Sequence, residues 1–353
     1  VGLFATTIDA NWDDSLVGDA SLVDPRIPTG AAVFTRNFIR KVETDNLAVF
    51  GELDYDLNDR WTLTAGARYD YEKIHSTEST RYSLTPQIVP LPDGADTDLS
   101  TSFTAFLPKA GVTYHWNEDV NTSFTVQRGY RAGGNDVNPF TLESGQFDTE
   151  YTWNYELALR STLLDGRMTF NGNLFYTDWE DQQVRVNGPS GNPNDTFVTN
   201  AGQSSLYGME LDASLQVTEQ LQVAAGIGYT RTEFDEFGND NTDFSGNEFP
   251  FAPEFTAFIG GEYRLTPQWF VQLDGNFTDN YYSGANNAAD EEVPARFILN
   301  GRVGYDAEDW SAVLFARNLT DKDYFTQRNE ILNVQRVRSG EPFTVGLELT
   351  ANF

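Results

Sequence analysis

Apolar and polar side chains alternate without interruption through the end of the sequence, residues 340–353. Phe343, Val345 and Leu347 begin an apolar series that contains no charge, whereas Glu348 lies on the opposite face. A period of two indicates a β-strand whose two faces meet different surroundings. We therefore predict a barrel wall with lipid on one side and water on the other.

The same alternation recurs upstream. Within residues 61–72, Trp61 and Leu63 begin the apolar face, while Arg68 and Glu72 lie on the polar face. Residues 221–229, 255–265 and 297–305 repeat the pattern. A soluble β-sandwich would produce the same alternation, so periodicity alone leaves both folds open.

The connections between these segments favour the barrel, because short and long ones alternate strictly. The short connections are residues 58–60, 117–119, 163–166, 218–220, 266–268 and 307–309. The long connections cover about residues 11–31, 75–101, 131–149, 186–196, 235–253, 283–292 and 326–340. Together they join about fourteen antiparallel strands. Short turns at one rim and long loops at the other are typical of an outer-membrane barrel, and a sandwich has no reason to sort its loops by length.

Aromatic residues gather beside the short turns. Their amphipathic rings suit the headgroup level of a membrane, which predicts an interfacial girdle, although aromatic residues are also common in strands of any kind. The residues concerned are Trp61, Trp116, Trp269 and Trp310, with Tyr55, Tyr114, Tyr263 and Tyr305 close to the same rim.

Composition narrows the possible functions. The net charge of -30, from 53 acidic and 23 basic residues, argues against a nucleic-acid partner, which requires clustered Lys and Arg. Cysteine is absent, so disulfides, thiolate metal sites and cysteine nucleophiles are excluded, and an oxidising compartment fits. No apolar run approaches the roughly 18 residues of a membrane-spanning helix, but a barrel strand does not need one. Because the chain begins at Val1 within a strand-like segment, we expect a processed or truncated piece of a longer protein.

Several ordered segments carry a family resemblance. They are residues 45–70 (DNLAVFGELDYDLNDRWTLTAGARYD), 107–135 (LPKAGVTYHWNEDVNTSFTVQRGYRAGGN), 153–159 (WNYELAL), 174–184 (LFYTDWEDQQV), 200–211 (NAGQSSLYGMEL) and 317–324 (RNLTDKDY). Over most of residues 45–353, the chain resembles the C-terminal two-thirds of the barrel of a TonB-dependent outer-membrane receptor. The order and spacing of the segments are more specific than any one of them.

This resemblance implies an importer in the Gram-negative outer membrane, embedded in its lipid. Such receptors take up scarce, bulky ligands, commonly ferric siderophores, and are energised by an inner-membrane TonB complex. Their barrels have 22 strands and a plugged lumen. We expect residues 1–353 to form one partial barrel domain without a plug, a fragment that contacts the TonB complex only through a region missing from this chain. The resemblance also implies that Phe353 is read by the barrel-assembly machinery.

If the chain is a fragment, the strands at residues 1–12 and 340–353 are unpaired edges rather than partners of each other. The alternative is a passive, fourteen-stranded diffusion channel, which would need a closed ring and no plug. A third possibility, an outer-membrane enzyme, has little support. His75 and His115 are the only histidines, and no nucleophile–base pair or Gly-x-Ser-x-Gly elbow occurs. We expect no enzyme, no cofactor and no catalytic, cofactor-binding or metal-binding residues.

Three groups of residues remain as candidate contacts. The acidic stretch at residues 235–243 could bind Ca²⁺, but it lacks EF-hand spacing and suits a solvated loop, as does the rest of the long connections.

Charged residues of the polar face form either a stiffening cross-strand ladder, a docking surface for a plug, or a track for an anionic ligand. They are Arg68, Arg160, Arg264, Arg302 and Arg317, facing Glu52, Asp54, Glu156, Asp212, Glu262 and Glu348. The extracellular candidates are Arg128, Tyr130 and Arg131 before Gly133 and Gly134, then Trp179, Tyr281 and Tyr282, which equally suit an upper aromatic girdle.

Overall fold

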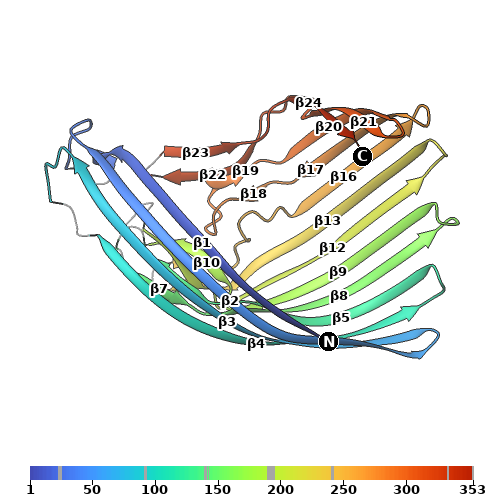
Figure 1. The fold of residues 1–353 in the computed structure, drawn as a ribbon, viewed down its shortest axis with the longest axis horizontal. Helices are drawn as coiled ribbons and strands as arrows, with labels where there is room; N and C mark the ends of the chain where they lie inside the picture. Colours follow the sequence, from blue (N-terminus) through green and yellow to red (C-terminus); the bar gives the residue numbers. More distant parts are fainter. Residues whose placement is uncertain are drawn as a thin grey trace.

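A single curved sheet of fourteen antiparallel strands dominates the computed structural model (Figure 1). The structure describes residues 1–22, 26–90, 94–138, 141, 143–188, 195–239, 242–331 and 334–351. Each strand pairs with its neighbours in sequence order, and the sheet forms an open trough. Within the described residues, β1 and β24 are its two edges and do not pair with each other. This arrangement confirms the predicted all-β architecture and strand number.

The strands of the trough follow the chain from one edge to the other. They are β1 (Gly2–Asp19), β2 (Val33–Asn58), β3 (Trp61–Thr85), β4 (Ala95–His115), β5 (Val120–Arg131), β8 (Glu150–Leu163), β9 (Met168–Glu180), β12 (Gln203–Gln216), β13 (Leu221–Glu236), β16 (Phe255–Arg264), β17 (Trp269–Thr278), β20 (Arg296–Asp306), β21 (Trp310–Arg317) and β24 (Thr344–Ala351). All six predicted short turns lie at one rim. No helix in the described ranges is long and apolar enough to cross a membrane.

Five of the long connections contain small two-stranded sheets at the opposite rim. They pair β6 (Gly134–Val137) with β7 (Ser144–Phe147), β10 (Gln183–Asn187) with β11 (Thr196–Asn200), β14 (Gly238–Asn239) with β15 (Thr242–Asp243), β18 (Tyr281–Tyr282) with β19 (Glu292–Val293), and β22 (Phe325–Ile331) with β23 (Val334–Ser339). Single 3-10 turns occur at Ala20–Leu22 and Ala289–Glu291. The connections therefore form a structured second layer, which the sequence did not predict.

The predicted connections at residues 11–31 and 75–101 are too long. β1 continues to Asp19, and β3 continues to Thr85. The reason is that these strands stay paired after the outward face has become polar, for example where Lys41 lies opposite Thr77. A search for alternating hydrophobicity ends where the apolar face ends, although the hydrogen-bonded ladder goes on.

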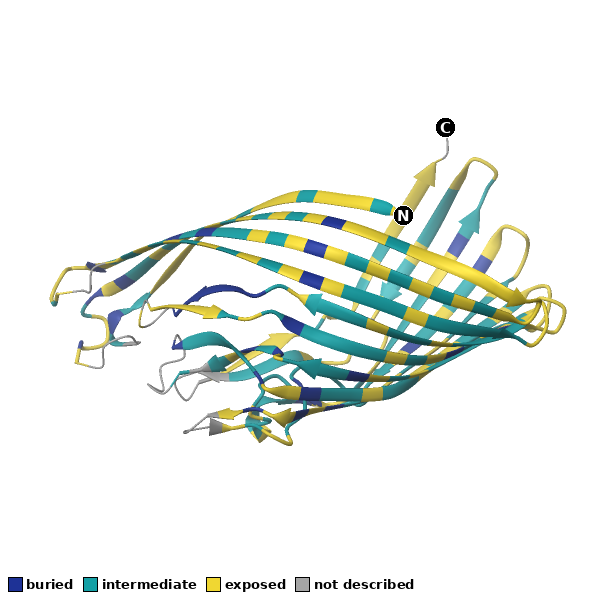
Figure 2. Ribbon diagram, turned by 90° about the horizontal axis from the view of Figure 1, so that it is seen from below, coloured by how far each residue is buried: buried dark blue, intermediate teal, exposed yellow. Residues whose placement is uncertain are grey.

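The apolar face of β3 has the height of the apolar band of an outer-membrane barrel. On β3 the apolar series begins at Trp61 and ends at Tyr71, after which Lys73 follows on the same face. Those eleven residues, at a rise of about 3.3 Å each and a tilt of about 40°, cover about 25 Å, the height of the apolar band of outer-membrane barrels. Figure 2 shows more and less exposed residues alternating along the strands. Exposed Leu and Ile side chains, such as Ile259 at 63%, fit contact with hydrocarbon.

Aromatic rings mark both limits of this belt. At the short-turn rim, the ring centroids of Trp61 and Tyr114 lie 4.7 Å apart, and those of Trp269 and Tyr305 lie 5.0 Å apart. At the opposite limit, Tyr155, Tyr176 and Tyr207 stand side by side on three adjacent strands. The structure thus brings together the girdle predicted beside the short turns and adds a second one. Phe353, for which the family resemblance implies recognition by the barrel-assembly machinery, lies outside the described residues.

A charge placed in the middle of the belt tests the lipid-facing assignment. We expect Ile259→Arg to lower the free energy of unfolding in lipid vesicles by about 2–4 kcal/mol, because the guanidinium would meet hydrocarbon. The control is Thr256→Arg, on the opposite, water-facing side of the same strand, which should cost little. Denaturant titration of the reconstituted protein measures both, and equal effects would contradict the assignment.

Candidate functional site

The concave face of the trough carries charged side chains, and only part of the expected ladder forms. Arg68 binds Asp70 through two hydrogen bonds of 2.5 and 2.6 Å. Arg264 lies 2.9 Å from Glu262 and 3.2 Å from Asp306. Arg160 instead donates to the Asn173 side chain and to carbonyl oxygens. The wall is therefore stiffened by ion pairs at some positions and by hydrogen bonds to neutral groups at others.

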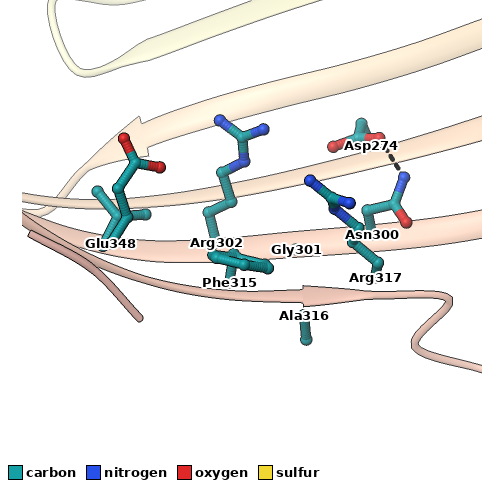
Figure 3. A pocket seen from close by; sticks show the side chains of 9 residues that line it. Asp274, Asn300, Gly301, Arg302, Phe315, Ala316, Arg317 and Glu348 are labelled. Atoms are coloured by element: carbon teal, nitrogen blue, oxygen red, sulfur yellow. Dashed lines mark hydrogen bonds between the residues drawn. The ribbon is translucent and has the colours of Figure 1, made fainter. Parts of the chain in front are cut away.

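Two further arginines of the predicted ladder, Arg302 and Arg317, line a hollow between the last four strands (Figure 3). Arg302 and Arg317 project to the same side as Glu348, whereas Ala316 points away from them. Arg302 makes no ion pair with any described residue, and Arg317 reaches Glu341 at 3.4 Å. The hollow has a volume of about 130 Å³. That volume suits a few waters or one charged side chain, because drug-sized ligands occupy about 300–1,000 Å³.

At the opposite rim, the small hairpins are locked to one another by amide side chains. Gln183 Nε2 donates to the carbonyl oxygens of Ala132 and Asp148 at 2.9 and 3.0 Å. Asn200 Nδ2 donates to the carbonyl oxygens of Asp148 and Asp181 at 3.0 and 2.7 Å. The first two extracellular hairpins therefore form one unit rather than two independent loops.

This extracellular layer has its own hydrophobic core. Phe234, Phe237 and Phe249 are buried together with Val184 and Ala201. The ring centroids of Phe234 and Phe249 lie 4.8 Å apart. The expectation of a fully solvated connection at residues 235–253 is therefore wrong. The Phe residues of this connection could have indicated a hydrophobic core. Their sequence neighbours are mostly Asp, Asn and Gly, and this polar composition favoured the prediction of a solvated loop.

The hairpin of β6 and β7 folds over the concave face of the first strands. All four residues of β6 are buried. Arg40 of β2 donates from Nη2 to the carbonyl oxygen of Asn135 at 3.1 Å, and Arg185 of β10 pairs with Asp136 at 2.9 Å. Glu78 lies beside this contact, and its burial raises the pKa of the carboxyl group. The mouth of the trough is thus narrowed by an ordered segment.

Tyr130, a predicted ligand contact, faces the wall instead. Its phenol is near Asn46 and the carboxylates of Asp70 and Glu72. Burial, followed by the negative charges of those two carboxylates, raises the pKa of Tyr130 to about 12. The hydroxyl therefore stays protonated and serves as a hydrogen-bond donor at any physiological pH.

Four other extracellular candidates also have partners within the protein. The Arg128 guanidinium lies 4.0 Å from the Tyr151 ring, and Arg131 pairs with Glu150 at 2.9 Å. Trp179 packs edge-on against Phe249 in the hydrophobic core. Tyr281 is buried and donates its hydroxyl to the carbonyl oxygen of Thr326 at 3.0 Å. These residues position the extracellular layer, and their contacts supply packing rather than a free binding surface.

The histidines and the acidic stretch have local partners. His115 contacts Thr62 at 3.0 Å near the short-turn rim, and His75 contacts Asp98 at 2.8 Å. Asp243 accepts from the Ser245 backbone N–H at 2.9 Å, and donation by Ser245 lowers the pKa of Asp243. Asp240 and Asn241 lie outside the described residues. Among the residues that are described, no group of three or more Asp, Glu, His or Cys side chains could hold a metal ion.

The arrangement is that of a wall with an ordered mouth. Water-facing charges line its concave side, an apolar belt covers its convex side, and interlocked hairpins stand over one rim. Such an arrangement can select, hold and pass a solute.

Comparison with known proteins identifies the family to which this fold corresponds. The family described as "TonB dependent receptor-like, beta-barrel" matches residues 2–319. The probable TonB-dependent siderophore receptor PiuA of Acinetobacter baumannii is 22% identical over 340 residues, covering 91% of this chain and 42% of that protein. The pesticin receptor of Yersinia pestis is 27% identical over 321 residues, covering 88% of this chain and 44% of that protein.

Solved structures share the fold. The ferric yersiniabactin uptake receptor FyuA from Yersinia pestis superimposes with a TM-score of 0.74 at 20% identity, over 99% of this chain and 55% of that one. The ferric citrate transporter FecA superimposes with a TM-score of 0.63 at 18% identity, over 99% of this chain and 58% of that one. The chain therefore spans about half the length of the relatives that it matches.

The hydrophobic core of the extracellular layer can be tested by truncating one ring. We expect Phe234→Ala to destabilise that layer by about 3–5 kcal/mol, because it leaves a cavity among buried aromatic rings. Phe251→Ala is the matched control, since Phe251 lies in the connection that follows β13 but is 50% exposed. Hydrogen exchange of the amides in β10, β11 and β13 reports the local stability, and identical exchange in both variants would contradict a common core.

The environment of Tyr130 predicts a high-pH transition. Because the folded pKa is raised above the unfolded value of 10.0, the stabilisation is fully present below pH 10 and is lost as the pH rises towards about 12. In ultraviolet titration, Tyr130→Phe should remove a phenol that ionises late. If the variant loses an early-titrating phenol instead, Tyr130 is not placed against the two carboxylates.

Proposed function

The chain belongs to the TonB-dependent receptor β-barrel family, and we propose that it forms the wall of an importer that takes up ferric siderophores. The family consists of transporters rather than enzymes and is located in the Gram-negative outer membrane. In this proposal, residues 1–353 are one barrel domain, and uptake is driven by an inner-membrane TonB complex.

One observation carries the proposal most directly, namely the combination of a lipid-height belt with an ordered extracellular layer. A solute that must be recognised before it passes requires fixed contacts at the mouth. The buried Phe cluster and the amide bridges of Gln183 and Asn200 supply rigid support for such contacts. Two relatives, a probable siderophore receptor of Acinetobacter baumannii and a ferric-pyoverdine receptor of Pseudomonas, suggest the class of solute.

The passive channel is the weaker alternative. It requires the fourteen strands to close into a ring, but in the described part of the chain β1 and β24 are open edges. The extracellular hairpins also fold over the concave side, where an unselective channel would need open space. Both observations argue for a recognised solute rather than free diffusion.

Energised uptake can be measured in cells that express the protein from its complete gene. We expect radiolabelled iron, supplied as a ferric siderophore, to accumulate only when TonB and the inner-membrane proton gradient are intact. Cells without the protein give the background. Equal accumulation with and without TonB, together with solute-driven swelling of vesicles that contain the protein, would favour the passive channel and contradict the proposal.

A further inference from the structure

The hairpin of β22 and β23 has two chemically different faces. Residues opposite each other in an antiparallel pair share a face, and consecutive pairs alternate. Arg328 lies opposite Val337, while Asn329 lies opposite Arg336 and Gln327 opposite Arg338. Arg328 and Val337 therefore belong to one face, and the other two pairs belong to the second.

The first face holds the hairpin against the rest of the extracellular layer. Arg328 Nη1 donates to the carbonyl oxygen of Glu292 at 3.0 Å, and its backbone N–H donates to Ser283 Oγ at 3.0 Å. Gln335 Nε2 donates to the carbonyl oxygen of Asp290 at 3.2 Å. The Tyr281 hydroxyl also donates a hydrogen bond to the carbonyl oxygen of Thr326. The hairpin is thus fixed in place before any ligand arrives.

The second face is unoccupied by any protein partner. The side chains of Gln327, Asn329, Arg336 and Arg338 make no hydrogen bond or ion pair within the described part of the chain, and both arginines are exposed. Each of the four carries N–H donors, and none is acidic. A rigid backbone therefore presents two guanidinium groups and two amides side by side.

This face contrasts with the charge of the whole chain. Acidic residues outnumber basic ones by 53 to 23, so the protein as a whole repels anions, and an anionic solute can be captured only where local donors outweigh that field. Arginine on an edge strand also discourages strand pairing. That role does not account for the amides of Gln327 and Asn329, which carry no charge.

We propose that Gln327, Asn329, Arg336 and Arg338 form an oxyanion-binding face that recognises a ligand through carboxylate or phosphate oxygens. Guanidinium groups bind such oxygens in pairs, and the amides complete the donor set. The inference rests on the proposed function, because it assigns the chemistry by which the importer first holds its solute. The hairpin connects β21 to β24, the strands that carry Arg317 and Glu348 of the hollow.

Binding can be measured without transport. The protein, expressed from its complete gene and purified from outer membranes, is placed in phosphatidylcholine vesicles and titrated with ferric citrate as the probe. We expect Arg336→Gln combined with Arg338→Gln to weaken binding by about tenfold or more, because charge-assisted hydrogen bonds are lost. Binding to the unmodified protein should also weaken with added salt, and less so in the variant.

The control is Arg60→Gln combined with Arg167→Gln, which removes the same charge at the short-turn rim. A second arm measures how much phosphorylated glycolipid copurifies with each protein. A loss of ferric citrate binding confined to the hairpin variant supports a free oxyanion ligand, whereas a loss of bound glycolipid alone supports a lipid headgroup. If neither changes relative to the control, the oxyanion-binding face is overturned.

The proposed function has a separate readout. Iron delivered to cells as ferric citrate should accumulate in a TonB-dependent manner through the unmodified protein, and to a lesser extent through the hairpin variant. Failure of that uptake in the unmodified protein would count against the importer itself. Normal uptake by the unmodified protein, together with unchanged ferric citrate binding in the variant, would contradict the oxyanion-binding face and leave the proposed function standing.

Discussion

Hydrocarbon cannot hydrogen-bond to a peptide group, and this constraint governs the structure. Every backbone N–H and C=O within the belt must find its partner on an adjacent strand, which leaves an antiparallel sheet with short turns as the economical solution. The side chains then divide by alternation into a lipid-facing and a water-facing set. At β1 and β24 the outward backbone groups remain without a partner strand among the described residues.

The sequence predicted the belt well, because each lipid-facing position is restricted in chemistry. Residues 61–71 show this clearly, since their apolar face ends where the membrane ends. Strand lengths beyond the membrane were not predictable in the same way. Between Lys73 and Thr85 the outward face of β3 carries only polar side chains, so the pattern fades while the ladder persists.

The extracellular layer was the least predictable part, because its contacts join residues that are distant in sequence. Asn200 bridges to Asp148, and Asn287 donates to the carbonyl oxygen of Glu248. Each looks like an ordinary loop residue when read alone. Likewise, Trp179 and Tyr281 resembled ligand anchors, although they serve packing. The face formed by Arg336 and Arg338 became visible only when the pairing register of the hairpin was known.

The amide bridges of Gln183 and Asn200 have a consequence for motion at the mouth. Both side chains belong to the β10–β11 hairpin, and both donate to backbone carbonyl oxygens beside the β6–β7 hairpin, so the bridges link the two hairpins to each other. Displacement of one requires displacement of the other, and the Phe cluster extends this linkage to the neighbouring connection. Motion at this rim is accordingly concerted, because the linked hairpins and the connection that packs against them must move together.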